Sequence, residues 1–91
     1  MMHYADEVQT LLNDGHTARA IEWLRKAIDK NLKDDRAWYM LGNAYCKLHD
    51  WRSAMESYME AIACNPESPA AESLKMVVSI VKFYNKDVYG Q

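Results

Sequence analysis

Large and small apolar residues recur at helical spacing between residues 38 and 66, and this pattern constrains the fold more than any other feature of the chain. In the first segment the pattern places four side chains on one helix face: Trp38, Leu41, Tyr45 and Leu48. Steps of three and four residues predict an amphipathic helix, and residues 54–62 repeat them. The connection around His49 and Asp50 is short, so the two helices are expected to run antiparallel as neighbours.

Small residues in this region mark where the two helices are expected to approach each other closely. Gly42, Ala54 and Ala61 leave room for the rings of Trp38 and Tyr58. Overfilling such a site typically costs about 1–3 kcal/mol, so a larger side chain at Gly42 is expected to destabilise the hairpin.

Acidic residues and prolines predict the helix ends. Asp34 and Asp35 are placed to cap the first helix, and Asp50 to cap the second, by accepting backbone N–H bonds that otherwise lack partners. Pro66 is expected to end the hairpin because proline cannot continue a helix.

The whole spacing resembles the 34-residue tetratricopeptide repeat, with tyrosine in the place of its phenylalanine. The matching residues are Trp38, Leu41, Gly42, Tyr45, Ala54, Tyr58, Ala61 and Pro66. The resemblance implies an all-α fold, a right-handed α-α superhelix of two antiparallel helical hairpins plus one capping helix, five helices in total. It also implies a protein that holds other proteins and performs no chemistry of its own.

A 34-residue step towards the amino terminus finds a weaker copy of the pattern. Ala20, Leu24 and Ala27 fall at the places of Ala54, Tyr58 and Ala61, and Gly15 suits the turn between two helices. Residues 1–34 are therefore interpreted as a degenerate repeat and residues 35–68 as the clear one. A terminal repeat is expected to be atypical because one of its sides faces solvent.

The pattern does not continue beyond residue 68. Ser68 and Pro69 predict a helix start, because serine caps and proline suits the first helical position. A capping helix is expected over residues 69–85, followed by a frayed tail over residues 86–91. Its packing stripe is expected to comprise Ala70, Leu74, Val77, Val78, Val81 and Tyr84.

Composition narrows the possible function classes. The chain has 91 residues, only 3 Gly and 2 Pro, and a net charge of −2 with both signs interspersed. The scarcity of glycine and proline argues against β architecture and against disorder. The absence of a basic stripe argues against nucleic-acid and membrane partners. With no apolar run of spanning length and no secretion signal, a cytoplasmic protein is expected.

No residue pattern points to catalysis, a cofactor or a metal. Cys46 and Cys64 form no paired motif and are expected to be free thiols. Cys46 and His49 have metal-like spacing, yet a structural zinc site needs four ligands and no second pair is present. Phosphate-cradling loops and nucleophile motifs are also missing. The chain is therefore not expected to be an enzyme.

The resemblance implies that the first helices of the hairpins line a concave groove for a peptide or protein segment. The candidate partner-binding residues are Arg36, Tyr39, Met40, Asn43, Lys47 and Gln9. Asn43 either bonds a bound peptide backbone, as the family implies, or is a solvated helix residue. Tyr39 and Met40 are either partner contacts or packing between repeats. Arg36 and Lys47 favour a moderately apolar, acidic segment.

A second stripe on the capping helix allows a different function. Met76, Ile80 and Phe83 lie on a face distinct from the packing stripe, which makes the helix apolar over more of its circumference than a surface helix needs. This stripe predicts either a homodimer or partner contact, or a helix rotated so that the stripe covers the last hairpin. The alternative function is thus a self-assembly module that dimerises through this helix. Trp23 and Trp51 are expected in the core.

Overall fold

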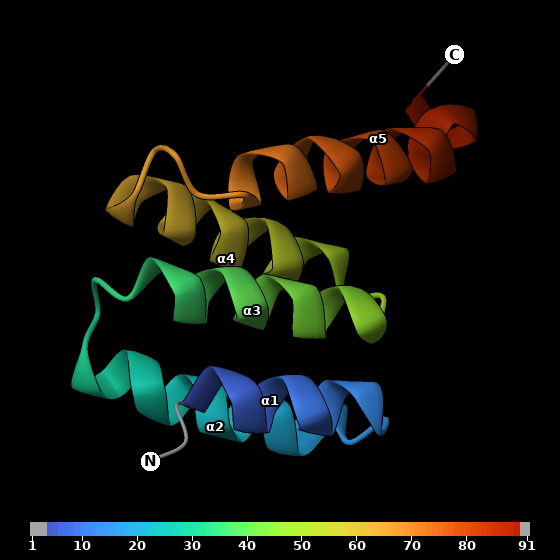
Figure 1. Ribbon diagram of the computed structural model, residues 1–91. Helices are drawn as coiled ribbons and strands as arrows, with labels where there is room; N and C mark the ends of the chain where they lie inside the picture. Colours follow the sequence, from blue (N-terminus) through green and yellow to red (C-terminus); the bar gives the residue numbers. More distant parts are fainter. Residues whose placement is uncertain (1–3, 90–91) are drawn as a thin grey trace.

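The computed structural model describes the backbone of residues 4–89 and the side chains of residues 4–84, and it confirms the all-α architecture. Within residues 4–89 there are five helices and no strand: α1 Tyr4–Asn13, α2 Thr17–Lys30, α3 Asp35–Lys47, α4 Trp51–Cys64 and α5 Ala70–Tyr89. Successive helices alternate in direction and each packs against the next, so that the helices form one stack (Figure 1). The stack measures 54 × 29 × 18 Å.

The core consists of two buried clusters that meet at α3. The first joins α1, α2 and α3 around Val8, Leu24 and Leu41, and the second joins α4 and α5 around Tyr58 and Val77. Three half-buried rings pack against both clusters: Trp38, Tyr39 and Tyr45. Helix α3 therefore joins the two hairpins, because its side chains pack in both cores.

The turns inside the two hairpins have the same geometry, 34 residues apart. Gly15 and His49 both adopt a positive φ, 84° and 58° respectively. The next residue in each turn donates its N–H to a carbonyl in the last helical turn, His16 to Leu11 at 2.8 Å and Asp50 to Tyr45 at 3.0 Å. This is the Schellman ending of a helix, which glycine adopts freely and histidine adopts under strain.

The connections after α2 and α4 also match, a feature that the sequence patterns did not single out. Asn31 and Asn65 are both extended, with φ of −151° and −149°. Each side-chain oxygen accepts a backbone N–H two residues further on, from Lys33 at 3.1 Å and from Glu67 at 3.0 Å. The two turns therefore use asparagine for the same reason, because its amide completes a tight local turn.

Inside the hairpins, one contact between the two helices pairs residues of very different size in the second repeat and of similar size in the first. A Cβ added at Gly42 would collide with the ring of Tyr58, and Tyr58 is fully buried. The equivalent positions of the first hairpin hold Val8 and Leu24, both fully buried as well. The two side chains at this contact thus divide the space between the facing helices differently in each hairpin, and each pair fills that space, as a closely packed interior requires.

The expected caps are present at the starts of α3, α4 and α5. Asp34 accepts the N–H of Ala37 at 3.1 Å, and Asp50 accepts the N–H of Ser53 at 3.2 Å. Ser68 accepts the N–H of Ala70 at 3.1 Å. Asp35 is not a cap: it is the first residue of α3, and its carboxylate accepts a bond from the Asn65 amide at 3.2 Å.

The end of α5 differs from the expectation. The helix continues to Tyr89, so residues 86–89 are helical and not a frayed tail, while residues 90 and 91 lie outside the described part. The reason is visible in the sequence, where Gly90 is the first helix breaker after Pro69.

Three apolar side chains expected in the core are exposed. Trp23 is 44% exposed because its neighbour Leu24 takes the core position of α2. Leu48 is exposed because it caps α3 beyond the last turn. Tyr84 is exposed because α5 has 20 residues and α4 only 14, so the last turns of α5 have no helix beneath them.

Candidate binding surface

The α3 residues expected to bind a partner form a single row, except for Met40. Arg36 and Lys47 are exposed at the two ends of α3, and Tyr39 and Asn43 are half-buried between them. Spacings of three and four residues place the row on one face of the helix. On α1, Gln9 is exposed, and its amide donates to the side chain of Asn13 at 3.0 Å.

Met40 is wrongly placed among the partner-binding residues. It is only 6% exposed and belongs to the first core, where α3 packs on the first hairpin. Ala37 and Ala44, three and four residues away, are fully buried on the same side of α3. Met40 is therefore packing between repeats, one of the two alternatives that its sequence position left open.

A hydrogen-bond network around the Tyr58 hydroxyl underlies the α3 row. The hydroxyl donates to the side-chain oxygen of Asn43 at 2.6 Å and lies 3.4 Å from the Cys46 sulfur. The Tyr39 and Tyr58 ring centroids are 6.1 Å apart. Asn43 is thus not merely solvated: its oxygen accepts a bond inside the protein, and its NH₂ group can serve as a donor.

Because the Tyr58 phenol is buried, we expect the folded protein to lose stability at alkaline pH. Burial raises the pKa of Tyr58 above its ordinary value, and the neighbouring Cys46 adds to the shift. Above about pH 10 the unfolded chain loses the phenolic proton while the folded chain keeps it. The contribution of Tyr58 to the free energy of unfolding is therefore fully present below that pH and falls as the pH rises further.

We expect urea unfolding followed by circular dichroism to show this decline in the wild type. The decline is expected to be shallower in Tyr58→Phe, with a residual slope from Tyr4, whose pKa burial also raises. An equal slope in the wild type and Tyr58→Phe would exclude Tyr58 as the group responsible.

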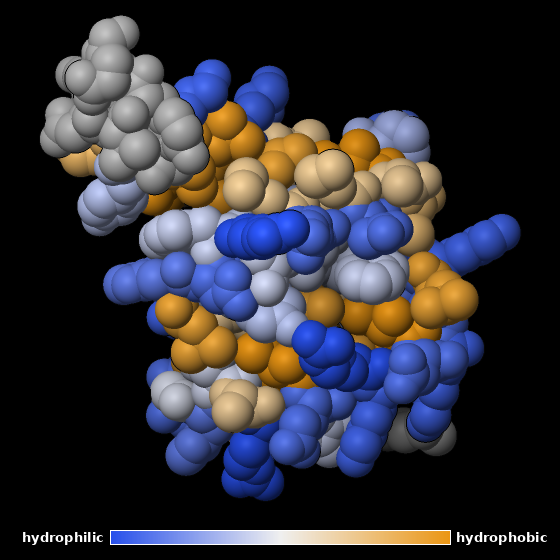
Figure 2. Space-filling view, turned by 180° about the vertical axis from the view of Figure 1, so that it is seen from behind, coloured by the Kyte–Doolittle hydropathy of each residue, from blue (hydrophilic) through white to orange (hydrophobic). Residues whose placement is uncertain are grey.

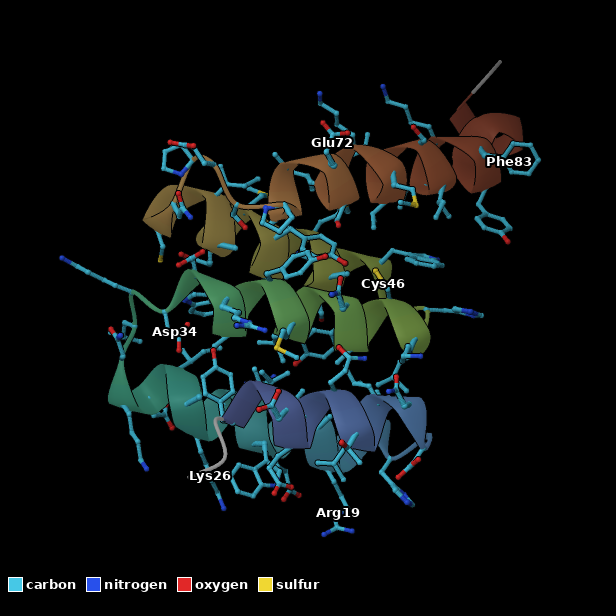
Figure 3. All side chains as sticks on the ribbon, viewed as in Figure 1. Arg19, Lys26, Asp34, Cys46, Glu72 and Phe83 are labelled. Carbon is cyan, nitrogen blue, oxygen red and sulfur yellow. The ribbon has the colours of Figure 1, made fainter. Side chains whose placement is uncertain are left out.

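The second candidate surface is a hollow beside the C-terminal half of α5. We call it the α5 hollow; its volume is about 480 Å³, and it is lined by His49, Trp51, Met76, Ser79, Ile80, Phe83 and Tyr84. Met76 and Phe83 are 63% and 73% exposed, and Ile80 is half-buried. The α5 stripe therefore does not cover the last hairpin, apart from part of Ile80. In Figure 3, Phe83 points away from the stack near the end of α5.

Two further hollows lie away from both surfaces. One of about 520 Å³ lies beside Tyr4, Trp23 and Lys26, and one of about 440 Å³ lies between α2 and α4. In the latter, the Arg25 guanidinium donates to the Tyr45 hydroxyl. Figure 2 shows the molecule from behind, where hydrophilic residues dominate the lowest part and hydrophobic residues gather in the upper part near α5 and in a band across the middle.

The side chains offer no metal cluster in the described part of the chain. Among those residues, no three His, Cys, Asp or Glu side chains come together, and Cys46 and Cys64 are free thiols. Likewise, no helix within residues 4–89 combines the length and apolar character needed to cross a bilayer.

The hairpins, their matching turns and their close helix–helix contacts define a helical-repeat protein, and comparison identifies the repeat. The family model of the tetratricopeptide repeat matches residues 35–68. The chain therefore belongs to the tetratricopeptide-repeat proteins. Repeats of this family generally mediate protein–protein interaction and are generally not enzymes.

A solved relative supports the same architecture over the whole length. A Bacteroides fragilis protein, determined in solution by NMR, is 40% identical and superimposes with a TM-score of 0.87. The match covers 100% of this chain and 92% of that one. A comparison with curated proteins finds no match.

Proposed function

We propose that this protein is a non-enzymatic interaction module that binds a peptide or protein segment across the face of α1, α3 and α5. The observation that carries the proposal is the α3 row, in which two exposed cations flank a tyrosine and an amide. Because Tyr58 donates to the Asn43 oxygen, Asn43 retains its NH₂ group for a partner, and this donor suits a carbonyl acceptor on a peptide backbone.

The dimensions and charges of the row indicate the kind of segment. Arg36 and Lys47 are about 16 Å apart along the helix axis, a distance that an extended segment of about five residues spans. Two cations at the ends favour carboxylates at the ends of the segment. The half-buried ring of Tyr39 favours an apolar residue between them.

Selection from a displayed peptide library tests this proposal. The wild type is expected to enrich short segments with acidic residues around an apolar centre. Arg36→Glu/Lys47→Glu is expected to bind the enriched peptides about tenfold more weakly, because two favourable charge contacts become repulsive.

The control carries equivalent charge changes at exposed positions elsewhere. Lys26→Glu/Arg52→Glu changes the net charge by the same amount on α2 and α4 and is expected to bind like the wild type. If the control loses binding while Arg36→Glu/Lys47→Glu retains it, the α3 row is not the binding face.

A further inference from the structure

We propose that the α5 hollow receives α5 of a second copy of this chain, forming a symmetric, concentration-dependent dimer. This inference is independent of the peptide-binding proposal, because it uses the Met76–Phe83 face of α5 and no residue of the α3 row. It commits to one of the two uses that the Met76–Ile80–Phe83 stripe left open.

Protruding residues and a cavity occur together on this surface. Phe83 and Met76 project from α5 with most of their side chains exposed, and both border the cavity of about 480 Å³. A surface that carries both a projection and a recess can pair with itself about a two-fold axis, which is the commonest symmetry of homo-oligomers.

Helix geometry places the complementary residues opposite each other. Met76 and Phe83 are equally distant from the midpoint between Ser79 and Ile80, and both of these residues also line the hollow. If two α5 helices cross antiparallel at that midpoint, Phe83 of one copy faces Met76 of the other. The same residues are then buried on both copies, as an isologous interface requires.

The opposite wall of the hollow is held in place before a partner arrives. The His49 and Trp51 rings stack with centroids 5.3 Å apart and planes 16° apart. His49 is fixed by the left-handed turn, where its backbone N–H donates to the backbone carbonyl of Cys46 at 3.0 Å. A wall ordered in the free chain loses little entropy on binding.

The charges around the hollow suit an apolar partner. Among the residues whose side chains the structure describes, none that lines the hollow is an Asp, Glu, Lys or Arg. Lys75 and Lys82 are exposed on the flank of α5, about 100° around the helix from Met76 and Phe83, and Lys75 pairs with Glu72 at 3.8 Å. A second α5 can thus cover this described lining without burying a fixed charge, which would otherwise be costly.

The available area indicates a weak dimer. Met76, Phe83 and Tyr84 are 63%, 73% and 69% exposed, which amounts to roughly 400 Å² of surface for side chains of this size. A standard interface buries about 800 Å² on each partner. The partly exposed Trp51 and Ile80 add to the patch without reaching that area, so monomers and dimers are expected to coexist.

Sedimentation equilibrium of the intact chain, from about 10 µM to about 1 mM, tests the proposal in the range expected for a small apolar interface. The mass is expected to rise from 10.6 kDa towards twice that value. Phe83→Glu and Met76→Glu are each expected to lower the association constant at least tenfold while leaving the circular dichroism spectrum unchanged.

Met59→Glu is the matched control, because Met59 is also an exposed helical methionine but lies outside the hollow, on α4. It is expected to dimerise like the wild type. A wild type that stays monomeric at the highest concentration would overturn the proposal. So would equal weakening by Met59→Glu and Met76→Glu, or a Phe83→Glu variant that dimerises normally. Arg36→Glu/Lys47→Glu is expected to keep the dimer, which separates this result from failure of the peptide-binding proposal.

Discussion

Gly42→Val is expected to lower the free energy of unfolding by about 2–3 kcal/mol, the upper part of the range for an overfilled core. Any Cβ at this position meets the buried Tyr58 ring, and the ring is enclosed by α3, α4 and α5 and cannot move aside. For a domain of this size the loss corresponds to a melting temperature lower by roughly 10–20 °C. Replacing glycine by a larger residue inside a helix usually stabilises that helix. A loss of stability in Gly42→Val would therefore point to the contact with Tyr58.

A double substitution is expected to recover most of that loss. Tyr58→Leu alone leaves a cavity and removes the hydroxyl bond to Asn43, for an expected cost of about 2–4 kcal/mol. Gly42→Val/Tyr58→Leu reproduces the Val8–Leu24 pair of the first hairpin. The loss in the double variant is therefore expected to be smaller than the two single losses added together by about 3 kcal/mol or more, at or above the upper end of the usual range for residues in contact.

Urea unfolding of the four proteins measures this coupling. The residual deficit of the double variant is expected to be about 1 kcal/mol, the net value of the lost hydroxyl bond. If the single losses simply add, the two hairpins do not share interchangeable contacts at these positions.

Trp38→Ala is expected to remove about 3 kcal/mol, the lower end of the range for truncating a large core aromatic residue, because Trp38 is half-buried. Trp38 packs against both cores, and its indole N–H donates to the Leu32 carbonyl at 2.9 Å in the connection between the hairpins. A small domain has total stability of about 5–15 kcal/mol, so this substitution removes a large part of it.

Trp38→Phe separates packing from the hydrogen bond, since it keeps a ring and loses the N–H. Its expected cost is smaller, about 1–2 kcal/mol. Hydrogen exchange is the second measurement: in Trp38→Ala, amides of α2 and α4 are expected to lose protection together. Loss confined to one hairpin would mean that Trp38 does not couple the two cores.

The sequence predicted the hairpin fold well because each hairpin depends on local spacing. Gly42 and Tyr58 were recognisable from size alone, and Asp34, Asp50 and Ser68 cap as expected. All of these features lie within the clear repeat or directly at its ends, where helical periodicity determines which side chains meet.

The misplaced residues depend on neighbours further away. Met40 and Tyr39 differ by one position on α3, and only the contact with the first hairpin decides that Met40 is buried. Tyr84 follows the packing stripe by periodicity, yet α4 is too short to cover it. The bond between Asn43 and Tyr58 joins different helices and has no signature in the spacing.

The equivalence of Asn31 and Asn65 has an architectural consequence. Both residues leave a helix with nearly the same backbone angles and complete the same local turn. Each asparagine thus marks the junction between one repeat unit and the next. A longer array could be assembled by duplicating residues 32–65 between these junctions, because contacts in such arrays form only between adjacent units.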